Sequence, residues 1–510
     1  MTTYASLIAD HPSDATAIGA PGRTGLSYGG LRDLAVATGD ALHSFGIGRG
    51  DRVAIVLPNG PEMATAFACV AQTCTTAPLN PAYKEEEYAF YLDDLGAKAL
   101  IVMDGYDGSA LPAAAQAGVA IIRLTPGALA GSFTLALEGA ALGKAETAAP
   151  TADDIALILH TSGTTSRPKI VPLLHSNVAA SARHIEASLA LTPEDTCLNV
   201  MPLFHIHGLI AAVSATLASG GQVFCAPGFD ALKFFAQMAE AKPTWYTAVP
   251  TMHQAILSRA PRNAETIAEN PLRFLRSSSA SLPPQVFAKL EQTFDAPVIE
   301  GYGMTEAAHQ MASNPLPPGK QIPGSVGIAA GSKVAIASET DPTLIQGTGE
   351  IVISGPNVTP GYENNDKANT DNFFNYEGER WFRTGDQGAL DDQGYLRLTG
   401  RLKEIINRGG EKISPLEIDE MLMDHPEVAQ VVAFAVPHPK LGEEVGAAVK
   451  LNDGSSLDAS ALKDFAKTRV AEFKIPRHIV VLDEIPKGAT GKMQRIGMAE
   501  KLGLVKEASS

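Results

Sequence analysis

The stretch TSGTTSRPK, residues 161–169, comes one histidine after the apolar run IALIL at residues 155–159. The apolar run is typical of a short buried strand, and the residues that follow it are mainly Thr, Ser and Gly. Gly163 allows the backbone to approach a ligand closely, and successive N–H groups can form an anion-binding nest. Further donors and positive charges come from Thr161, Ser162, Thr164, Thr165, Ser166, Arg167 and Lys169. The stretch therefore predicts an oxyanion-binding loop at the end of a sheet strand.

The loop has two alternative interpretations. The NTPase P-loop, G-x-x-x-x-G-K-[ST], requires a second glycine before its lysine and a hydroxyl residue after it. Counting from Gly163, Pro168 occupies the second glycine position and Ile170 follows Lys169, so the P-loop pattern fails twice. A solvated Ser/Thr turn remains an alternative on the loop alone.

Composition limits the class of protein. The 510-residue chain is long enough for two or more domains, and its 45% hydrophobic content indicates soluble globular packing. Forty Lys and Arg residues against 56 Asp and Glu residues give a net charge of −16, which disfavours general binding to nucleic acid or to an anionic membrane. We expect no nucleic-acid partner, no membrane insertion, and a monomer or homodimer.

Cysteine spacing and the termini predict the compartment. Cys69, Cys74, Cys197 and Cys225 lack C-x-x-C spacing, so we expect reduced core thiols rather than disulfides or a metal site. The N-terminus resembles no signal peptide, no apolar run approaches the roughly 20 residues of a spanning helix, and the C-terminus is not the peroxisomal S-K-L. The sequence predicts a cytoplasmic protein.

Hydrophobic patterning predicts an α/β fold in at least two parts. Short apolar runs alternate with amphipathic or Ala-rich stretches from about residue 51 to residue 301, as in a sheet flanked by helices. Short glycine-punctuated segments between residues 324 and 400 predict a small β-rich subdomain. A separate α+β alternation follows, and we place a domain boundary between residues 400 and 401. Expected strands are residues 52–57, 99–103, 120–124, 155–159, 222–225, 244–248, 274–277 and 298–300, then 428–436, 445–451 and 478–482, with C-terminal helices at 415–424 and 457–472.

A second chemical motif is EGYGMTE, residues 300–306. Two glycines around Tyr302 let the ring stand beside a ligand, and Glu306 offers a hard oxygen ligand for magnesium. Gly-aromatic-Gly turns are common, so the motif alone is weak evidence. Three more motifs follow along the chain: RTGD at residues 383–386, GRLK at 400–403 and PKGATGK at 486–492.

Taken together, these motifs resemble those of the adenylate-forming superfamily of acyl-CoA synthetases, luciferases and peptide-synthetase adenylation domains. Members of that superfamily usually have Gly where this chain has Ser166. The resemblance covers nearly the whole chain. It implies a large N-terminal adenylation domain, residues 1–400, with the ATP and acyl pockets, and a small mobile C-terminal domain, residues 401–510, with a catalytic lysine.

The resemblance implies ATP, Mg²⁺ and CoA as cofactor or co-substrates and assigns residues to each. The loop at residues 161–169 would hold the β- and γ-phosphates of ATP, and Tyr302 would lie against adenine. Thr305 would contact the α-phosphate, and Glu306 would bind magnesium. Asp386 would accept the ribose hydroxyls, because one carboxylate can accept two O–H donors, and Arg401 would lie nearby.

The C-terminal domain would supply the remaining groups. Lys492 would bridge the substrate carboxylate and the α-phosphate, Lys403 would act as the hinge between domains, and Gly409 and Gly410 would present backbone to the pantetheine of CoA. The alternative for the two glycines is an ordinary turn before a helix.

The implied reaction has two steps. A carboxylate attacks the α-phosphorus of ATP to give an acyl-adenylate and pyrophosphate, and a thiol then attacks the activated carbonyl and expels AMP. Water would hydrolyse the adenylate, so the site must close for the first step and reopen to CoA for the second.

Polar residues bear on the identity of the acid. His205 resembles the histidine that stands at the entrance to the acyl pocket in the superfamily, and His207 is additional. An H-x-H pair could bind zinc, but no third ligand is spaced nearby. A pocket lined by His207, Ser279 and His309 disfavours a fatty tail, because unpaired buried polar groups cost about 1–3 kcal/mol each. It favours a short acid with a second carboxylate.

Three segments resemble oxalate–CoA ligases of plants and fungi: SSSASL at residues 277–282, MTEAAHQMASNPLP at 304–317 and INRGGEKISP at 406–415. We therefore expect oxalate as the substrate. Malonate or another small or medium-chain acid is the alternative, and the histidines could instead satisfy hydrogen bonds in the core.

Two other classes of protein stay open. An adenylation module would load a carrier protein in trans, and a nucleotide-binding protein would lack ligase activity. The presence of Glu306, Asp386 and Lys492 favours an enzyme.

Overall fold

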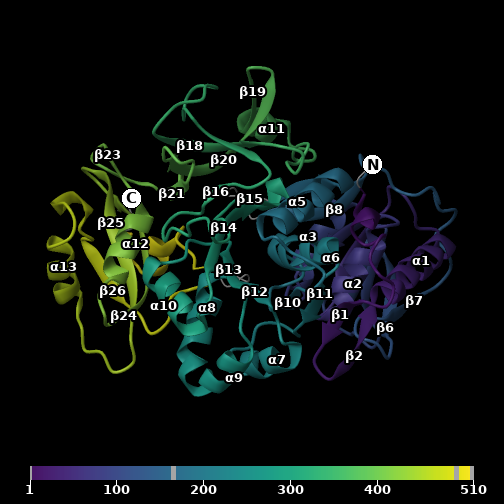
Figure 1. The fold of residues 1–510 in the computed structure, drawn as a ribbon. Helices are drawn as coiled ribbons and strands as arrows, with labels where there is room; N and C mark the ends of the chain where they lie inside the picture. The colour runs from purple at the N-terminus through teal and green to yellow at the C-terminus, as the bar shows by residue number, and fades with distance from the viewer. Residues whose placement is uncertain (1–2, 162–167, 488–492, 506–510) are drawn as a thin grey trace.

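The computed structural model describes residues 3–161, 168–487 and 493–505 (Figure 1). In these residues the strands form four sheets. The α/β class predicted from the sequence is confirmed. Two large sheets make up most of the N-terminal part, a smaller sheet forms the β-rich subdomain, and another forms the C-terminal part.

One of the large sheets has seven strands, most of them parallel. In spatial order the strands are β7 (Phe133–Leu137), β6 (Ala120–Pro126), β5 (Ala99–Met103), β3 (Arg52–Val56), β4 (Thr75–Pro78), β8 (Ile155–Thr161) and β9 (Lys169–Leu174). The inner strands β3, β5 and β8 are mainly apolar, as is typical of a parallel sheet that is buried on both faces. The helices that follow its strands along the chain are α2 (Pro61–Val70), α3 (Glu85–Leu95), α4 (Ala110–Ala117) and α5 (His175–Ser188).

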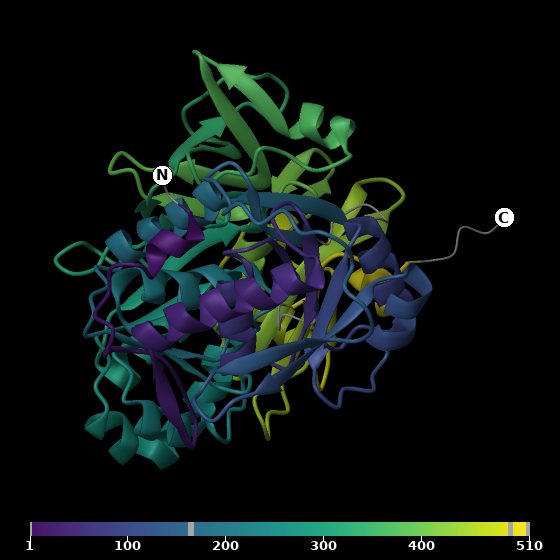
Figure 2. The same cartoon turned by 90° about the vertical axis from the view of Figure 1, so that its right-hand side faces the viewer.

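The other large sheet has nine strands and a parallel centre. In spatial order they are β16 (Ile328–Ala329), β15 (His309–Ser313), β14 (Val298–Met304), β13 (Phe274–Ser278), β12 (Trp245–Ala248), β10 (Thr196–Asn199), β11 (Gln222–Cys225), β1 (Thr16–Ala20) and β2 (Arg23–Ser27). The helices nearby in sequence are α1 (Tyr28–Phe45), the π-helix η2 (His207–Ser214), α6 (Ala215–Ser219), α7 (Phe234–Ala241), α8 (Pro250–Arg259), α9 (Ala264–Glu269) and α10 (Pro284–Phe294). Figure 2 shows α1 lying across one outer face of the molecule.

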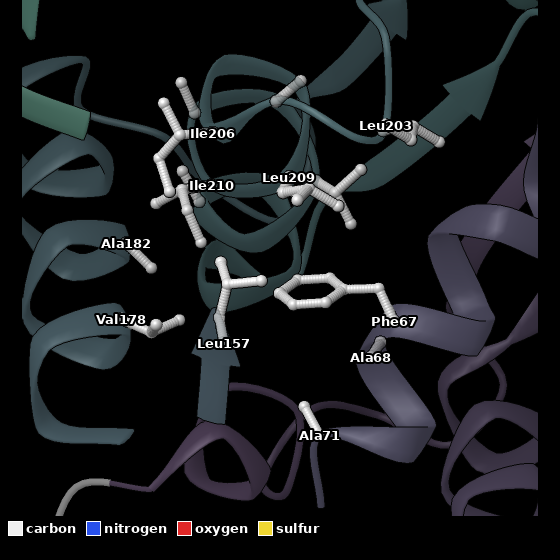
Figure 3. Close-up of a cluster of buried hydrophobic side chains, with 14 of the residues drawn as sticks. Phe67, Ala68, Ala71, Leu157, Val178, Ala182, Leu203, Ile206, Leu209 and Ile210 are labelled. Carbon is white, nitrogen blue, oxygen red and sulfur yellow. The ribbon is translucent and has the colours of Figure 1, made fainter. Parts of the chain in front are cut away.

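A continuous apolar core joins the two large sheets. Figure 3 shows Phe67 of α2 and Leu157 of β8 pointing toward Leu209 and Ile210 of η2. All four side chains are fully buried. This packing fixes η2 against the seven-stranded sheet, and therefore fixes the position of His207 at its first turn.

The β-rich subdomain stands on one side of the two large sheets (Figures 1 and 2). Its strands are β17 (Lys333–Ala337), β18 (Thr348–Ser354), β20 (Glu379–Leu390), β19 (Phe373–Tyr376) and β21 (Leu396–Arg401), with the helix α11 (Asp366–Asn372). Because β21 pairs with β20, the residues around the predicted domain boundary still belong to this sheet. The boundary itself stays a prediction.

The C-terminal part has its own sheet and its own core. The strands are β23 (Glu411–Ile413), β22 (Ile406–Arg408), β25 (Gly442–Leu451), β24 (Val428–His438) and β26 (His478–Val481), with helices α12 (Pro415–Met423), α13 (Ala459–Lys467) and α14 (Met498–Lys501). It contacts the nine-stranded sheet's helices: Gln430 Nε2 donates to Gln254 Oε1 on α8 at 2.9 Å, and Gln285 on α10 bonds to Asp424.

The predicted strands are all present, most of them within three residues of the expected ends; one strand and one helix differ more. Strand β14 runs on to Met304, past the expected end at residue 300, because its last residues pair with β15 as a hairpin. Helix α13 ends at Lys467 rather than at residue 472, and the chain then forms a short 3-10 turn. The four cysteines are free and buried, as expected. The described helices include none that is both long and apolar enough to cross a membrane.

Candidate active site

A cleft of about 760 Å³ lies where the nine-stranded sheet, the β-rich subdomain and the C-terminal part meet. The carboxyl ends of β13 and β14 contribute Ser279 and Tyr302, β20 contributes Asp386, and β21 contributes Arg401. Ligands of open α/β sheets bind at the carboxyl ends of the strands. The cleft thus brings together four residues that the sequence assigned to nucleotide or acid binding.

Asp386 is held between an aromatic hydroxyl and a guanidinium. Tyr302 donates its O–H to Asp386 Oδ2 at 2.5 Å, and Arg401 Nε lies 3.4 Å from Asp386 Oδ1. The antiparallel pairing of β20 with β21 places Asp386 directly opposite Arg401. The Asp386 carboxylate raises the pKa of Arg401, and burial raises the pKa of Tyr302. The result is an anchored carboxylate at the cleft wall, which suits a diol ligand.

Glu306 forms a second polar cluster, in the 3-10 turn η4 (Thr305–Ala307) just after β14. Its carboxylate is buried and accepts a hydrogen bond from the Tyr362 hydroxyl at 2.8 Å. Lys169 Nζ lies 4.3 Å from the centre of the Tyr362 ring. Burial raises the pKa of Glu306 and lowers the pKa of Lys169, while each of the two charges opposes the other's shift. A cation bound next to Glu306 would therefore stabilise the ionised form of its carboxylate.

The ends of the predicted phosphate loop face each other, because Thr161 and Lys169 are paired across β8 and β9. Residues 162–167, which include Ser162, Gly163, Thr164 and Thr165, lie outside the described residues, as does Lys492. Tyr362 was not predicted from the sequence. It comes from a loop far along the chain, and no local pattern marks it.

The three polar residues predicted to line an acid pocket do lie together. His207 is fully buried; its Nδ1 lies 2.9 Å from Ser279 Oγ, and its Nε2 lies 2.6 Å from Thr247 Oγ1. The ring centres of His207 and His309 are 5.1 Å apart. His205 accepts a hydrogen bond at Nδ1 from the His207 backbone N–H at 3.3 Å. We call His207, Ser279, Thr247 and His309 the polar cluster.

Two residues of the polar cluster have backbone conformations that side chains rarely adopt. Ser279 has φ 75° and His309 has φ 104°. Non-glycine residues in such conformations cost about 1–3 kcal/mol each, and they concentrate at functional sites where surrounding structure holds them in place. The strain supports a functional interpretation of the polar cluster over a role in core hydrogen bonding alone.

Sequence reasoning left Thr247, Gln310 and Arg276 without a role. Arg276 lies in the middle of β13 and is fully buried beside His207. A charged residue inside a short strand of apolar and small residues was a signal that could have identified it.

Gly409 and Gly410 form the two-residue loop between β22 and β23. Their φ values are 60° and 95°, and a tight hairpin loop of this kind needs positive φ at both positions. The expected alternative, a turn immediately before a helix, is therefore wrong in its position, because strand β23 separates the glycines from α12. Binding of CoA here stays a prediction.

The H-x-H pair, His205 and His207, could bind zinc only together with further ligands. In the described part of the chain, no group of three or more His, Cys, Asp or Glu side chains is arranged to hold a metal ion. Both ring nitrogens of His207 lie against hydroxyl oxygens.

Glu300, at the cleft, gives a pH-dependent prediction for stability. Its side chain is 2% exposed, Oε1 accepts the Leu282 N–H at 2.9 Å, and burial raises its pKa to about 8. The folded protein therefore keeps a proton that the unfolded chain has lost above about pH 4.5. Stability from this group is present at low pH and is lost as pH rises through about 8.

We expect Glu300→Gln to reduce this pH dependence, because the amide keeps the acceptor for Leu282 without a titrating proton. In thermal unfolding between about pH 6 and pH 9, the wild-type Tm should fall more steeply than that of the variant. Parallel curves would show that Glu300 does not titrate in this range.

Comparisons with known proteins agree with this geometry. The AMP-binding enzyme family model matches residues 6–363, and the AMP-binding enzyme C-terminal domain model matches residues 417–492. The oxalate–CoA ligase of Arabidopsis thaliana is 44% identical over 94% of this chain and 94% of its own length. The oxalate–CoA ligase of Saccharomyces cerevisiae is 43% identical over 89% of this chain and 87% of its own.

A solved structure is also similar over nearly the full length. The crystal structure of ATP-bound MatB from Rhodopseudomonas palustris is 29% identical, with a TM-score of 0.87, over 98% of this chain and 99% of that one. The family model covers well over half of the chain, and the relatives extend the match to nearly all of it. The chain therefore belongs to the AMP-binding enzyme family.

Proposed function

We propose that the protein is an ATP-dependent acid–CoA ligase that forms an acyl-adenylate and then a CoA thioester, with oxalate as its acid. The observation that carries the choice of acid is the buried polar cluster of His207, Ser279, Thr247 and His309 beside the cleft. The names and identities of the two oxalate–CoA ligases support the same choice.

The cleft and its surroundings contain residues suited to binding ATP. Asp386 would accept the ribose hydroxyls in exchange for its bonds to Tyr302 and Arg401, and Tyr302 would offer its ring to adenine. Lys169 would supply positive charge near the phosphates. Glu306 is the residue that would hold Mg²⁺; its buried carboxylate is a hard oxygen ligand, and a divalent cation would offset the burial that raises its pKa. The ion would draw negative charge from the phosphate oxygens.

The polar cluster would orient the acid. A carboxylate accepts hydrogen bonds and has no donor, so hydroxyls and protonated ring nitrogens are suitable partners. The cluster offers these from Ser279, His207 and His309, whereas an alkyl tail can form no hydrogen bond with them, and any group that loses its partner to the tail costs about 1–3 kcal/mol. A short dicarboxylic acid satisfies more of these groups than a fatty acid does.

The two steps would use different parts of the chain. Lys492 would neutralise charge while one anion attacks another, and rotation of the C-terminal part about Lys403 would then bring Gly409 and Gly410 to CoA. Closing the site in the first step protects the adenylate from water. The buried free cysteines support a reducing, cytoplasmic setting.

The experiment separates three classes of protein. Exchange of labelled pyrophosphate into ATP that depends on oxalate would distinguish an enzyme from a nucleotide-binding protein. Rapid AMP release that requires free CoA would distinguish a ligase from a carrier-loading module. Exchange without a response to CoA would contradict the ligase, and no exchange with oxalate would contradict the choice of acid.

We expect His309→Ala to reduce kcat/KM for oxalate by about tenfold, because it removes a hydrogen-bonding group beside His207. Activity on acetate should change by less than about threefold, since acetate has no second carboxylate to hold. The measurement is the ratio of initial rates on the two acids. Equal losses on both would remove His309 from the choice of acid.

A further inference from the structure

Arg276 is a buried cation whose charge has no acidic partner in the described part of the chain. Its side chain is 0% exposed. Nη2 donates to Gln310 Oε1 at 3.2 Å, Nη1 lies 3.5 Å from His207 Nε2, and Nε has no hydrogen-bond partner. Fully buried arginines are almost always paired with a carboxylate, because isolated buried charge is costly.

Arginines of the chain that are more exposed than Arg276 do have acidic partners. Arg495 lies 2.8 Å from Asp419 and 3.2 Å from Glu404, and Arg383 pairs with Glu350 at 2.5 Å. Arg273, on the approach to the same strand, pairs with Asp195 at 2.8 Å. The unpaired charge of Arg276 therefore indicates an anion that is supplied from outside the chain.

The guanidinium lies directly behind the wall of the cleft. Gly301 lines the cleft, and a Cβ atom at that position would come within 2.8 Å of Arg276 Nη2. The absence of a side chain at residue 301 leaves the guanidinium room to reach this wall. On the other side, His207 connects Arg276 to Ser279, which also lines the cleft.

Together these contacts point to a specificity residue: the geometry assigns Arg276 as the counter-charge for the second carboxylate of a short dicarboxylic acid. This inference rests on the proposed function, since it assumes that the acid binds against the polar cluster. The two oxygens of a carboxylate can accept two hydrogen bonds from the planar guanidinium. Water does not screen the attraction between the charges in a buried pair of this kind. Burial lowers the pKa of Arg276 only to about 10, so the charge is present at neutral pH.

The test compares oxalate with glyoxylate, which has nearly the same size but lacks the second charge. Removing one partner of a buried charge pair affects binding strongly, so Arg276→Gln should reduce kcat/KM for oxalate by about 100-fold. Activity on glyoxylate should change by less than about threefold, so the preference between the two acids collapses. Arg276→Lys, which keeps the charge, should retain part of the preference.

The matched control is Arg273→Gln, the same chemical change at an arginine that has its own acid partner. It should lower thermal stability and leave the oxalate-to-glyoxylate ratio unchanged. Arg276→Gln should instead keep or raise the Tm of the ligand-free protein, because it removes an unpaired buried charge. A purely structural Arg276 predicts a lower Tm and equal losses on both acids, and that result would overturn the inference.

Failure of the inference and failure of the proposed function give different results. If wild-type protein uses another diacid in place of oxalate, the choice of oxalate is wrong, and Arg276 is tested on that diacid against its singly charged analogue. If Arg276→Gln does not fold, Arg276→Lys decides: a raised KM for the diacid alone supports the inference, and equal losses overturn it. A wild-type preference for uncharged tails would overturn both.

Discussion

Replacing Lys492 with alanine is expected to slow formation of the acyl-adenylate by about 10²–10³-fold, because it removes a preorganised positive charge at the point where one anion attacks another. Lys492 lies outside the described residues, and the prediction rests on its place in PKGATGK, residues 486–492, and on membership of the family. The measurement is the rate of oxalate-dependent exchange of pyrophosphate into ATP.

A matched control is available in the same segment. Lys487 lies 3.6 Å from Glu484 and is one of the two lysines of the motif, so Lys487→Ala removes the same charge a few residues away. It should leave the exchange rate within about twofold of wild type, as expected for an exposed ion pair. The second step should survive in Lys492→Ala when preformed oxalyl-adenylate is supplied with CoA. Equal effects of the two substitutions would contradict a special role for Lys492.

Glu306→Gln is expected to reduce adenylate formation by about 100-fold and to raise the concentration of Mg²⁺ needed for half-maximal rate. The amide keeps an acceptor for the Tyr362 hydroxyl but has no charge to offer a cation or Lys169. The measurement is initial rate against Mg²⁺ at saturating ATP and oxalate.

Tyr362→Phe serves as the control for Glu306. It removes the hydroxyl that donates to the carboxylate while keeping the ring beneath Lys169. Because the carboxylate keeps its charge, the Mg²⁺ concentration needed for half-maximal rate should stay close to that of wild type, even if loss of the hydrogen bond lowers the rate. A Mg²⁺ dependence unchanged in Glu306→Gln would contradict the assignment of Glu306 as the metal ligand.

Local sequence patterns predicted the strands that are buried on both faces of a sheet. They did not predict strands that form only because distant parts of the chain pair with them. Strand β8 was predicted because residues 155–159 are continuously apolar, as buried parallel strands are. Strand β4 (Thr75–Pro78) was not predicted, because it is short and ends in proline. It forms because β3 and β8 pair with it from either side. The division of the strands between two large sheets has no local signal.

The residues of the candidate site were also predicted only in part from the sequence. Motifs identified Ser279, His207 and His309, and the fold brings them together from β13, η2 and β15. Their partners could not be predicted, since Thr247 and Tyr362 are ordinary residues in their local sequence and gain a role only through packing. Arg276 is intermediate: its charge within a buried strand was visible, but its lack of an acid partner is a property of the folded protein.

The central claim is that this chain joins oxalate to CoA, and competition between acids tests it most directly. Purified protein would receive ATP, Mg²⁺ and CoA with equal concentrations of oxalate, malonate, succinate, acetate and octanoate, and the thioesters formed at early times would be identified by mass spectrometry. The account predicts that oxalyl-CoA is the main product and that its formation matches the AMP released. A different acyl-CoA as the main product, or AMP release without any thioester, would contradict it.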